Sequence, residues 1–404
     1  MRFIPTRYQR PEILLMLMAA AVPLSFATWS ALINNFAVEM ANFGGAEIGI
    51  LQSIREVPGF LALLFVFALL IMREQTLALV MLALLGLGTA ATGFFPSLLG
   101  LCITAFIGSV GFHFYDTAQQ SLSLQWFEIE KTPEVLGRLI AVGSAGAIAS
   151  YGLVWLAFKA GGLDFKATYL IGGGLTLVIM TTAALGFPHF PEKVVQKKTL
   201  ILRRRYWLYY ALTFMSGARR QIFIVFAGFL LVQKFGFPVE NMALLFLATS
   251  MINVPLAPRI GRLVRRWGER PALILEYSGL IIVFTAYAFV THAMVAAALY
   301  IIDHLFFALA IAIRTYFQKI ADPADIASTA GVSFTINHIA AVMIPAALGI
   351  VWVASPPAVF LSGAAMAAIS LFLSLLVPGN PTPGNETIQK GAGIIFPGTA
   401  GSSG

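Results

Sequence analysis

The feature that most constrains this chain is a series of long apolar runs that recur along almost its whole length. Each run has about 20 to 28 residues, enough for a helix to cross a hydrocarbon layer of ~30 Å. Apolar residues make up 59% of the 404 residues and charged residues only 11%, far from the roughly 45–50% and 25% of soluble domains. The chain is therefore predicted to be an all-α integral membrane protein, since the sequence lacks the alternating pattern of barrel strands.

Glycine and proline turns divide the apolar runs into twelve predicted transmembrane helices. Their bounds are 14–38, 46–72, 75–95, 97–125, 133–159, 165–187, 207–234, 239–263, 270–291, 293–319, 325–353 and 356–377. The longest connection follows the sixth span. We therefore expect an N-terminal six-helix bundle over residues 1–187, a cytoplasmic linker over 188–206, a C-terminal six-helix bundle over 207–378, and a disordered tail over 379–404.

Lysine and arginine gather on one side of the predicted membrane. The predicted outer loops hold only Lys159, Lys166 and Lys234, whereas the termini, the linker and the opposite loops hold most of the others. This asymmetry predicts cytoplasmic N- and C-termini in a multi-pass protein of the cell (inner or plasma) membrane. It also accounts for the net charge of +8, so no nucleic-acid partner is expected, only the lipid bilayer.

The two halves of the chain echo each other at a spacing of ~190 residues. Trp126-Phe127 before Pro133 corresponds to Tyr316-Phe317 before Pro323, and by the same offset His113 falls on Asp303. Two repeats of equal span number, with a site near the midplane between them, are typical of secondary transporters. The sequence therefore predicts two pseudo-symmetric bundles.

With these features the chain resembles the major facilitator superfamily over about residues 10–378. The best local match is the loop after the eighth span, which is similar to the family motif G-x-L-x-D-R-x-G-R-K/R. The matching residues are Gly261, Leu263, Arg266, Gly268 and Arg270, while Arg265 replaces the aspartate and Glu269 the second basic position. The resemblance implies that the matching residues help to hold the cytoplasmic gate, and that spans 1, 4, 7 and 10 line a central cavity with help from 2, 5, 8 and 11.

A polar helix face interrupts the fourth apolar run. At about 100° per residue this face carries His113, Asp116, Thr117 and Gln120. Such groups cost several kcal/mol of desolvation inside a membrane unless a function retains them. Asp116 is our leading candidate for proton coupling, with Asp303 and Glu56 as competitors. The alternative is that Asp116 is permanently paired with His113 or an arginine and only holds helices together.

Several other polar residues inside the spans are candidates for substrate binding. Arg219 and Arg220 favour recognition of a carboxylate or phosphate, although they could instead neutralise buried carboxylates. Arg55 and Glu56 are predicted to form a structural ion pair, and one of them can bind a partner on the eleventh span, where Asn337 and His338 lie at similar depth. The predicted substrate-binding set is Asn34, Asn35, Arg55, His113, Gln120, Arg219, Arg220, Phe307, Arg314, Asn337 and His338.

The predicted function is secondary active transport of a small organic solute, coupled to protons and working by alternating access. The arginines inside the spans indicate a preference for anionic or amphipathic substrates. The alternative is a transporter of a divalent transition metal or metal chelate, using the His and Asp residues of spans 4 and 10, with potential ligands His113, Asp116, Asp303, His304 and His338. No catalytic or ATP-binding motif is found, so we expect neither an enzyme nor a cofactor; a transporter-like sensor is the remaining class. The protein is expected to be a monomer.

Overall fold

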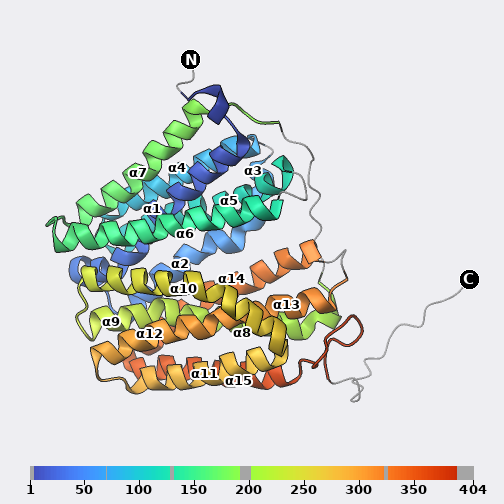
Figure 1. Cartoon of the computed structure of the whole chain (residues 1–404). Helices are drawn as coiled ribbons and strands as arrows, with labels where there is room; N and C mark the ends of the chain where they lie inside the picture. The colour runs from blue at the N-terminus through green and yellow to red at the C-terminus, as the bar shows by residue number, and fades with distance from the viewer. Residues whose placement is uncertain (1–3, 70, 128–131, 192–201, 323–325, 389–404) are drawn as a thin grey trace, which may run out of the picture.

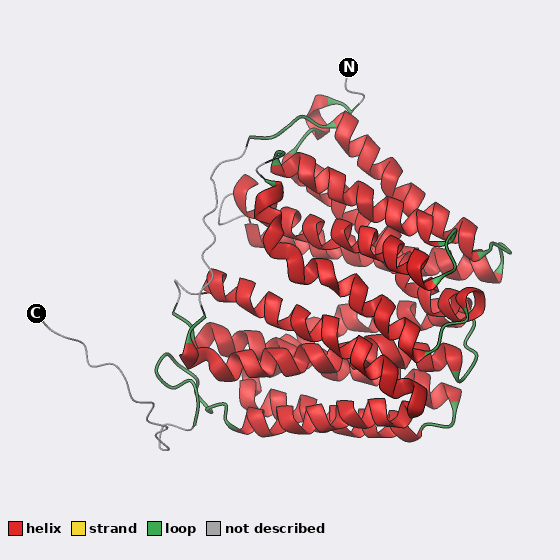
Figure 2. Cartoon of the chain, turned by 180° about the vertical axis from the view of Figure 1, so that it is seen from behind, coloured by secondary structure: helices red, strands yellow, loops and turns green. Residues whose placement is uncertain are grey.

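The computed structural model describes the whole chain except residues 1–3, 70, 128–131, 192–201, 323–325 and 389–404 (Figure 1). The described residues form helices joined by short loops, with no strand among them (Figure 2). This confirms the all-α class. Helix is the expected outcome for apolar runs of this length, because every backbone N–H and C=O must find a partner within the segment.

Fifteen α-helices are described. They are α1 (Pro11–Ala41), α2 (Gly45–Phe60), α3 (Phe65–Ala68), α4 (Glu74–Thr92), α5 (Leu98–Trp126), α6 (Thr132–Lys159), α7 (Phe165–Gly186), α8 (Trp207–Ile222), α9 (Gly228–Gln233), α10 (Val239–Trp267), α11 (Glu269–Phe289), α12 (Ala293–Phe307), α13 (Ile311–Ile320), α14 (Ile326–Ala354) and α15 (Pro356–Leu375). A π-helical segment, Phe223–Ala227, joins α8 to α9, and a 3₁₀ turn, Ala308–Ala310, joins α12 to α13.

Eleven helical segments in the described part of the chain are long and apolar enough to cross a membrane. The second predicted span differs, because it consists of α2, a 3₁₀ turn over Leu61–Leu64, and the short α3. Pro58 and Gly59 lie just before the change from α to 3₁₀ geometry, and both residues weaken an α-helix at that point. Twelve crossings and the cytoplasmic position of the termini stay predictions.

The helices lie in two groups, α1–α7 and α8–α15, which Figure 1 shows one above the other. In the first group α4 packs against α5 and α7, and in the second group α11 packs against α15. Between the groups the main pairs are α2 with α14 and α6 with α10. One apolar core cluster lies within the first group, whereas the other includes residues of both groups.

The two groups meet closely at the ends of the helices that carry the turns at residues 42–44, 160–164 and 235–238; we call this the closed end (left in Figure 1). Here the Asn35 amide donates to the Phe237 carbonyl at 2.7 Å, and the Tyr151 and Phe246 rings lie 5.6 Å apart. Small residues let α2 and α14 approach, since a side chain on Gly49 would begin 2.3 Å from the Pro345 carbonyl oxygen.

This packing makes a testable prediction for Gly49→Val. The added side chain cannot fit against α14. We therefore expect the two helix groups to separate at the closed end, so that a conformation open at this end becomes dominant. Spin labels at Met40 and His292, both exposed at this end, would report a longer distance in a Cys102→Ser background. Gly152→Val is the matched control, because nothing lies within 4 Å of the new Cβ. Equal distances in both variants would contradict the prediction.

Part of the predicted linker and tail is described. Residues 192–201 of the linker and 389–404 of the tail lie outside the described residues. Residues 379–388 return to the helices: the Tyr316 hydroxyl donates to the Glu386 carbonyl at 2.6 Å, and the Ile388 amide donates to the Leu376 carbonyl at 3.0 Å. These contacts attach Glu386 and Ile388 of the predicted tail to α13 and to the end of α15.

Candidate functional site

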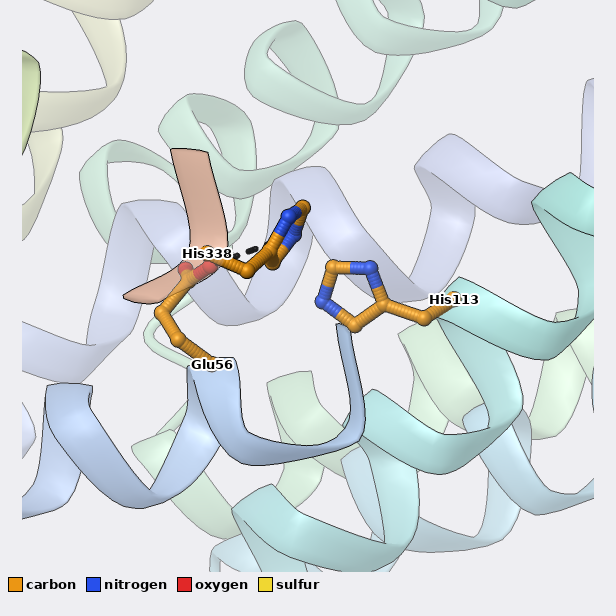
Figure 3. Close-up of side chains that lie close together, drawn as sticks. All are labelled: Glu56, His113 and His338. Carbon is orange, nitrogen blue, oxygen red and sulfur yellow. Dashed lines mark ion pairs between the residues drawn. The ribbon is translucent and has the colours of Figure 1, made fainter. Parts of the chain in front are cut away.

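Three ionisable side chains from both helix groups converge in the interior (Figure 3). Glu56 comes from α2, His113 from α5 and His338 from α14, and one nitrogen or oxygen atom of each lies within 4.8 Å of the others. His338 Nε2 and Glu56 Oε2 are 3.8 Å apart. We call these residues the central triad. It sits where α2 packs against α14, so it links the two groups of helices.

The orientation of His338 determines what its second nitrogen can do. Its Nδ1 lies 2.8 Å from the Phe334 carbonyl, which only accepts, so Nδ1 carries a proton. Nε2 therefore faces Glu56 either as a bare acceptor or as the second N–H of an imidazolium. In the first state two acceptors face each other, and in the second an ion pair joins α2 to α14. A single proton thus decides whether this contact is attractive.

Gly59 makes room for the two histidine rings, a role that we did not predict from the sequence. A Cβ at this position would lie 2.1 Å from His338 Cδ2 and 3.0 Å from His113 Cε1. The two rings pack nearly perpendicular, with centroids 5.1 Å apart. Only a glycine one turn after Glu56 lets both rings reach the carboxylate, and the nearby Pro58-Gly59 pair is the signal that could have indicated it.

Two arginines flank the central triad. Arg55 donates to Glu56 Oε1 and lies over the Trp29 ring at 5.5 Å, while Arg220 of α8 donates to the Asn337 amide oxygen at 3.0 Å. The Nε atoms of both arginines are buried without a hydrogen-bond partner among the described residues. With neutral histidines, two guanidinium groups and one carboxylate leave a net charge of +1. This region is therefore set up to attract an anion.

Arg219, although adjacent to Arg220, lies in a different environment. It forms an ion pair with Glu276 of α11 at 3.3 Å and stacks over the Tyr277 ring at 4.6 Å. Both charged side chains are almost completely buried within the second group of helices. Successive helical residues point about 100° apart, which explains how neighbouring arginines serve two clusters.

Asp303 belongs to this second cluster and not to the central triad. It is buried on α12, close enough to interact electrostatically with Arg219 and Glu276, and its Oδ1 atom lacks a hydrogen-bond partner among the described residues. We missed Glu276 in the sequence, where it is a single carboxylate two turns into an apolar helix. An intramembrane acid of this kind is itself the signal that should have been followed.

The other predicted site residues are spread over the structure. Asp116, Gln120 and Arg314 are exposed, and Phe307 is partly buried. Asp116 and Gln120 follow His113 on one face of α5. No hydrogen bond or ion pair to Asp116 is found among the described residues, and its role as the leading proton carrier stays a prediction.

The two asparagines of α1 lie at the closed end. Asn35 donates to Glu39 at 3.0 Å as well as to Phe237, so its amide joins α1 to the turn before α10. Asn34 is buried, and its Nδ2 lies 2.8 Å from the place that a Cβ of Gly228 would occupy. Both asparagines therefore contact the second group, and substrate binding by them stays a prediction.

The segment that resembles a gating motif forms the last turns of α10 and the start of α11, and only Gly268 lies between the two helices. Gly268 has a φ of 90°, which favours glycine over residues with a side chain. Leu263 packs against the apolar core, Arg266 is exposed and Arg270 is partly buried. Glu269, a departure from the motif, binds Lys319 of α13 at 2.8 Å, which attaches the start of α11 to a neighbouring helix.

The central triad is the one group in the described part of the chain with three side chains close enough to hold a metal ion. It is not the set that we predicted, because Asp303 and Asp116 lie outside it and His304 Nδ1 contacts the Tyr300 carbonyl at 3.0 Å. Arg55, bonded to Glu56, would repel a cation. The donor types suit a first-row metal, but the charge around them favours an anion.

Comparison with known proteins gives a consistent result. The family model described as Major Facilitator Superfamily matches residues 15–345, and no curated protein matches. Among solved structures, the nucleoside transporter NupG has a TM-score of 0.72 at 17% identity, covering 91% of this chain and 98% of that one. A bacterial homologue of the human lysosomal transporter Spinster, inward-facing and occupied, has a TM-score of 0.73 at 11% identity, covering 94% and 98%. This chain is a multi-pass membrane transporter and belongs to the Major Facilitator Superfamily.

Proposed function

We propose that this protein transports a small organic anion in exchange with, or together with, protons that bind at the central triad. The observation that carries the proposal is the contact between Glu56 of the first helix group and His338 of the second, 3.8 Å apart and flanked by Arg55 and Arg220. It combines a proton-dependent link between the groups with an excess of positive charge.

Proton coupling follows from what the central triad does in each protonation state. A proton on His338 Nε2 creates an ion pair with Glu56 and favours the packing of α2 on α14. Loss of that proton removes the attraction and leaves two acceptors 3.8 Å apart. Because transport by alternating access requires these helices to separate, the proton acts on the step that exposes the site. His113 lies within 4.8 Å of Glu56, a distance that one water molecule can bridge for proton exchange.

The substrate contact is assigned to Arg220 and Asn337. Glu56 already neutralises Arg55, whereas in the described part of the chain the uncharged Asn337 amide is the one hydrogen-bond partner of Arg220. A carboxylate or phosphate would supply the missing charge and could accept from the free Nε. Aromatic rings nearby, including Trp29 beneath Arg55 and Phe112 stacked on Phe26 at 4.6 Å, suit a flat apolar body.

Uncharged nucleosides are the substrates named for NupG, and they provide a sharp contrast. Both ligand classes would stack on the aromatic rings, but only an anion gains from the net positive charge. Stabilisation of the purified protein against heat by benzoate, nicotinate and uridine monophosphate, compared with uridine, separates the two. Stabilisation by uridine alone, or only by a divalent metal such as Zn²⁺ or Mn²⁺, would refute anion transport.

We expect Arg220→Gln to weaken binding of the anion that stabilises best by about 10- to 100-fold. A hydrogen bond to a charged group contributes about 1.5–3 kcal/mol, which corresponds to that range. Isothermal titration of the purified variant measures the effect. Lys159→Gln, which removes one exposed positive charge at the closed end, is the matched control and should retain the wild-type dissociation constant. Equal affinity in Arg220→Gln would remove Arg220 from the site.

A further inference from the structure

A surface groove of about 640 Å³ lies at the turn between α10 and α11, far along the chain from the central triad. It is lined by Trp267, Arg270, Pro271, Ile274, Leu275, Ser278 and Gly379. Its walls come from the end of α10, the first turns of α11 and the loop that follows α15. None of these residues takes part in the proposed transport site.

The groove changes from charged to apolar along α11. Arg270, Ile274 and Ser278 are spaced by four residues, so they follow one another along a single helix face, with a rise of about 6 Å per step. Arg270 is in the first turn of α11, a helix long and apolar enough to cross a membrane, so we expect it near the membrane surface and Ile274 and Leu275 deeper. Trp267, half exposed at the rim, is the residue type that collects at membrane interfaces.

The rim of the groove carries positive charge without an internal counter-ion. The arginines of this segment are Arg259, Arg262, Arg265, Arg266 and Arg270. Among the described residues none of them forms an ion pair that would neutralise it. The acid within the segment, Glu269, is buried and bound to Lys319 at 2.8 Å. Basic clusters next to a membrane helix attract anionic lipids, by about 1 kcal/mol per residue.

We propose that this groove binds one anionic phospholipid of the adjacent leaflet. The phosphate binds at Arg270, which lines the groove, with the exposed Arg266 four residues earlier in the chain, and an acyl chain follows Ile274 and Leu275 down α11. The groove and a phospholipid match along their length, since the basic end of the groove would face the headgroup layer and its apolar end the hydrocarbon.

Retention of lipid by the purified full-length protein tests this site. Native mass spectrometry would compare phosphatidylglycerol with phosphatidylcholine of the same acyl chains. We expect the wild type to retain phosphatidylglycerol preferentially, and the double variant Arg266→Gln, Arg270→Gln to lose about thirtyfold in apparent affinity. Arg7→Gln combined with Arg73→Gln is the control, because it removes two exposed charges elsewhere on the chain and should retain the lipid.

A second variant tests the apolar part of the groove. Ile274→Gln should weaken retention of phosphatidylglycerol while leaving the basic rim intact, which a purely electrostatic attraction would not show. Equal retention of both lipids by the wild type, or an equal loss in the control variant, would overturn the proposal. So would equal thermal stabilisation by inorganic phosphate or glycerol phosphate, which indicates a soluble ligand, or preferential binding of a polyglutamate peptide, which indicates an acidic protein partner.

Discussion

Glu56→Gln is expected to abolish transport driven by a pH gradient. The amide keeps the size of the side chain but cannot form the ion pair with a protonated His338, so the protonation state no longer acts on the packing of α2 against α14. In proteoliposomes, uptake of the anion identified by thermal stabilisation should no longer respond to the pH gradient and should fall to the level measured without one. Exchange without a gradient should persist.

The design separates coupling from loss of fold and from loss of substrate binding. Glu12→Gln is the control, since Glu12 pairs with Arg138 near the start of α1 and lies outside the proposed site. Asp116→Asn, assayed in parallel, tests the competing carboxylate. Full gradient-driven uptake by Glu56→Gln would refute the assignment of coupling to the central triad, and its loss in Asp116→Asn alone would restore our leading prediction from the sequence.

Glu276→Gln is expected to cause a large loss of stability in the second helix group. It leaves the buried Arg219 guanidinium without its ion-pair partner, and breaking a buried pair from one side costs about 3–5 kcal/mol. Chemical unfolding in detergent, followed by tryptophan fluorescence, should show this as a lower denaturant midpoint. Glu12→Gln serves again as the control, because a solvent-exposed pair contributes about 0–1 kcal/mol.

A double variant shows whether the lost energy reflects an uncompensated charge. Replacing both partners, Arg219→Met with Glu276→Met, removes the charges together and should recover most of the stability, since apolar replacements of buried ion pairs are often neutral or stabilising. Asp303 would then be the remaining acid of the cluster. If Glu276→Gln unfolds at the wild-type midpoint, the pair does not stabilise the fold.

The membrane helices could be predicted because a local pattern indicates each of them: a run of apolar residues bounded by glycine and proline. The central triad could be foreseen only in part. A partner for Arg55 or Glu56 at the depth of Asn337 and His338 was predicted from the sequence, and Glu56 lies 3.8 Å from His338. The approach of His113 to both depends on which helices pack together, and no local pattern indicates it. Arg219 and Arg220 show the same limit: adjacency suggested one site, whereas the step of about 100° between neighbours places them in two clusters.

The roles of small and isolated residues were the hardest to foresee. Gly59 has no side chain that could indicate a role in the sequence, and it matters because the His113 and His338 rings of two other helices pack against it. Glu276 was overlooked because a lone acid in an apolar helix has no sequence partner. The second predicted span was located correctly as a helical segment, but its change to 3₁₀ geometry after Gly59 reflects a local weakness that hydropathy does not measure.

The π-helical segment Phe223–Ala227 connects the part of the helix that carries the buried arginines to the part that contacts the first helix group. Such a segment holds one residue more than the α-helical turn it replaces. Before it lie Arg219 and Arg220, and after it lie Gly228, facing Asn34, and Gln233, which accepts from the Trp352 indole at 2.9 Å. With one residue fewer, the second half of this helix would turn by about 100° relative to the first. The extra residue therefore sets the rotation of one continuous helix, so that Arg219 and Arg220 reach their clusters while Gly228 and Gln233 face their partners at the closed end.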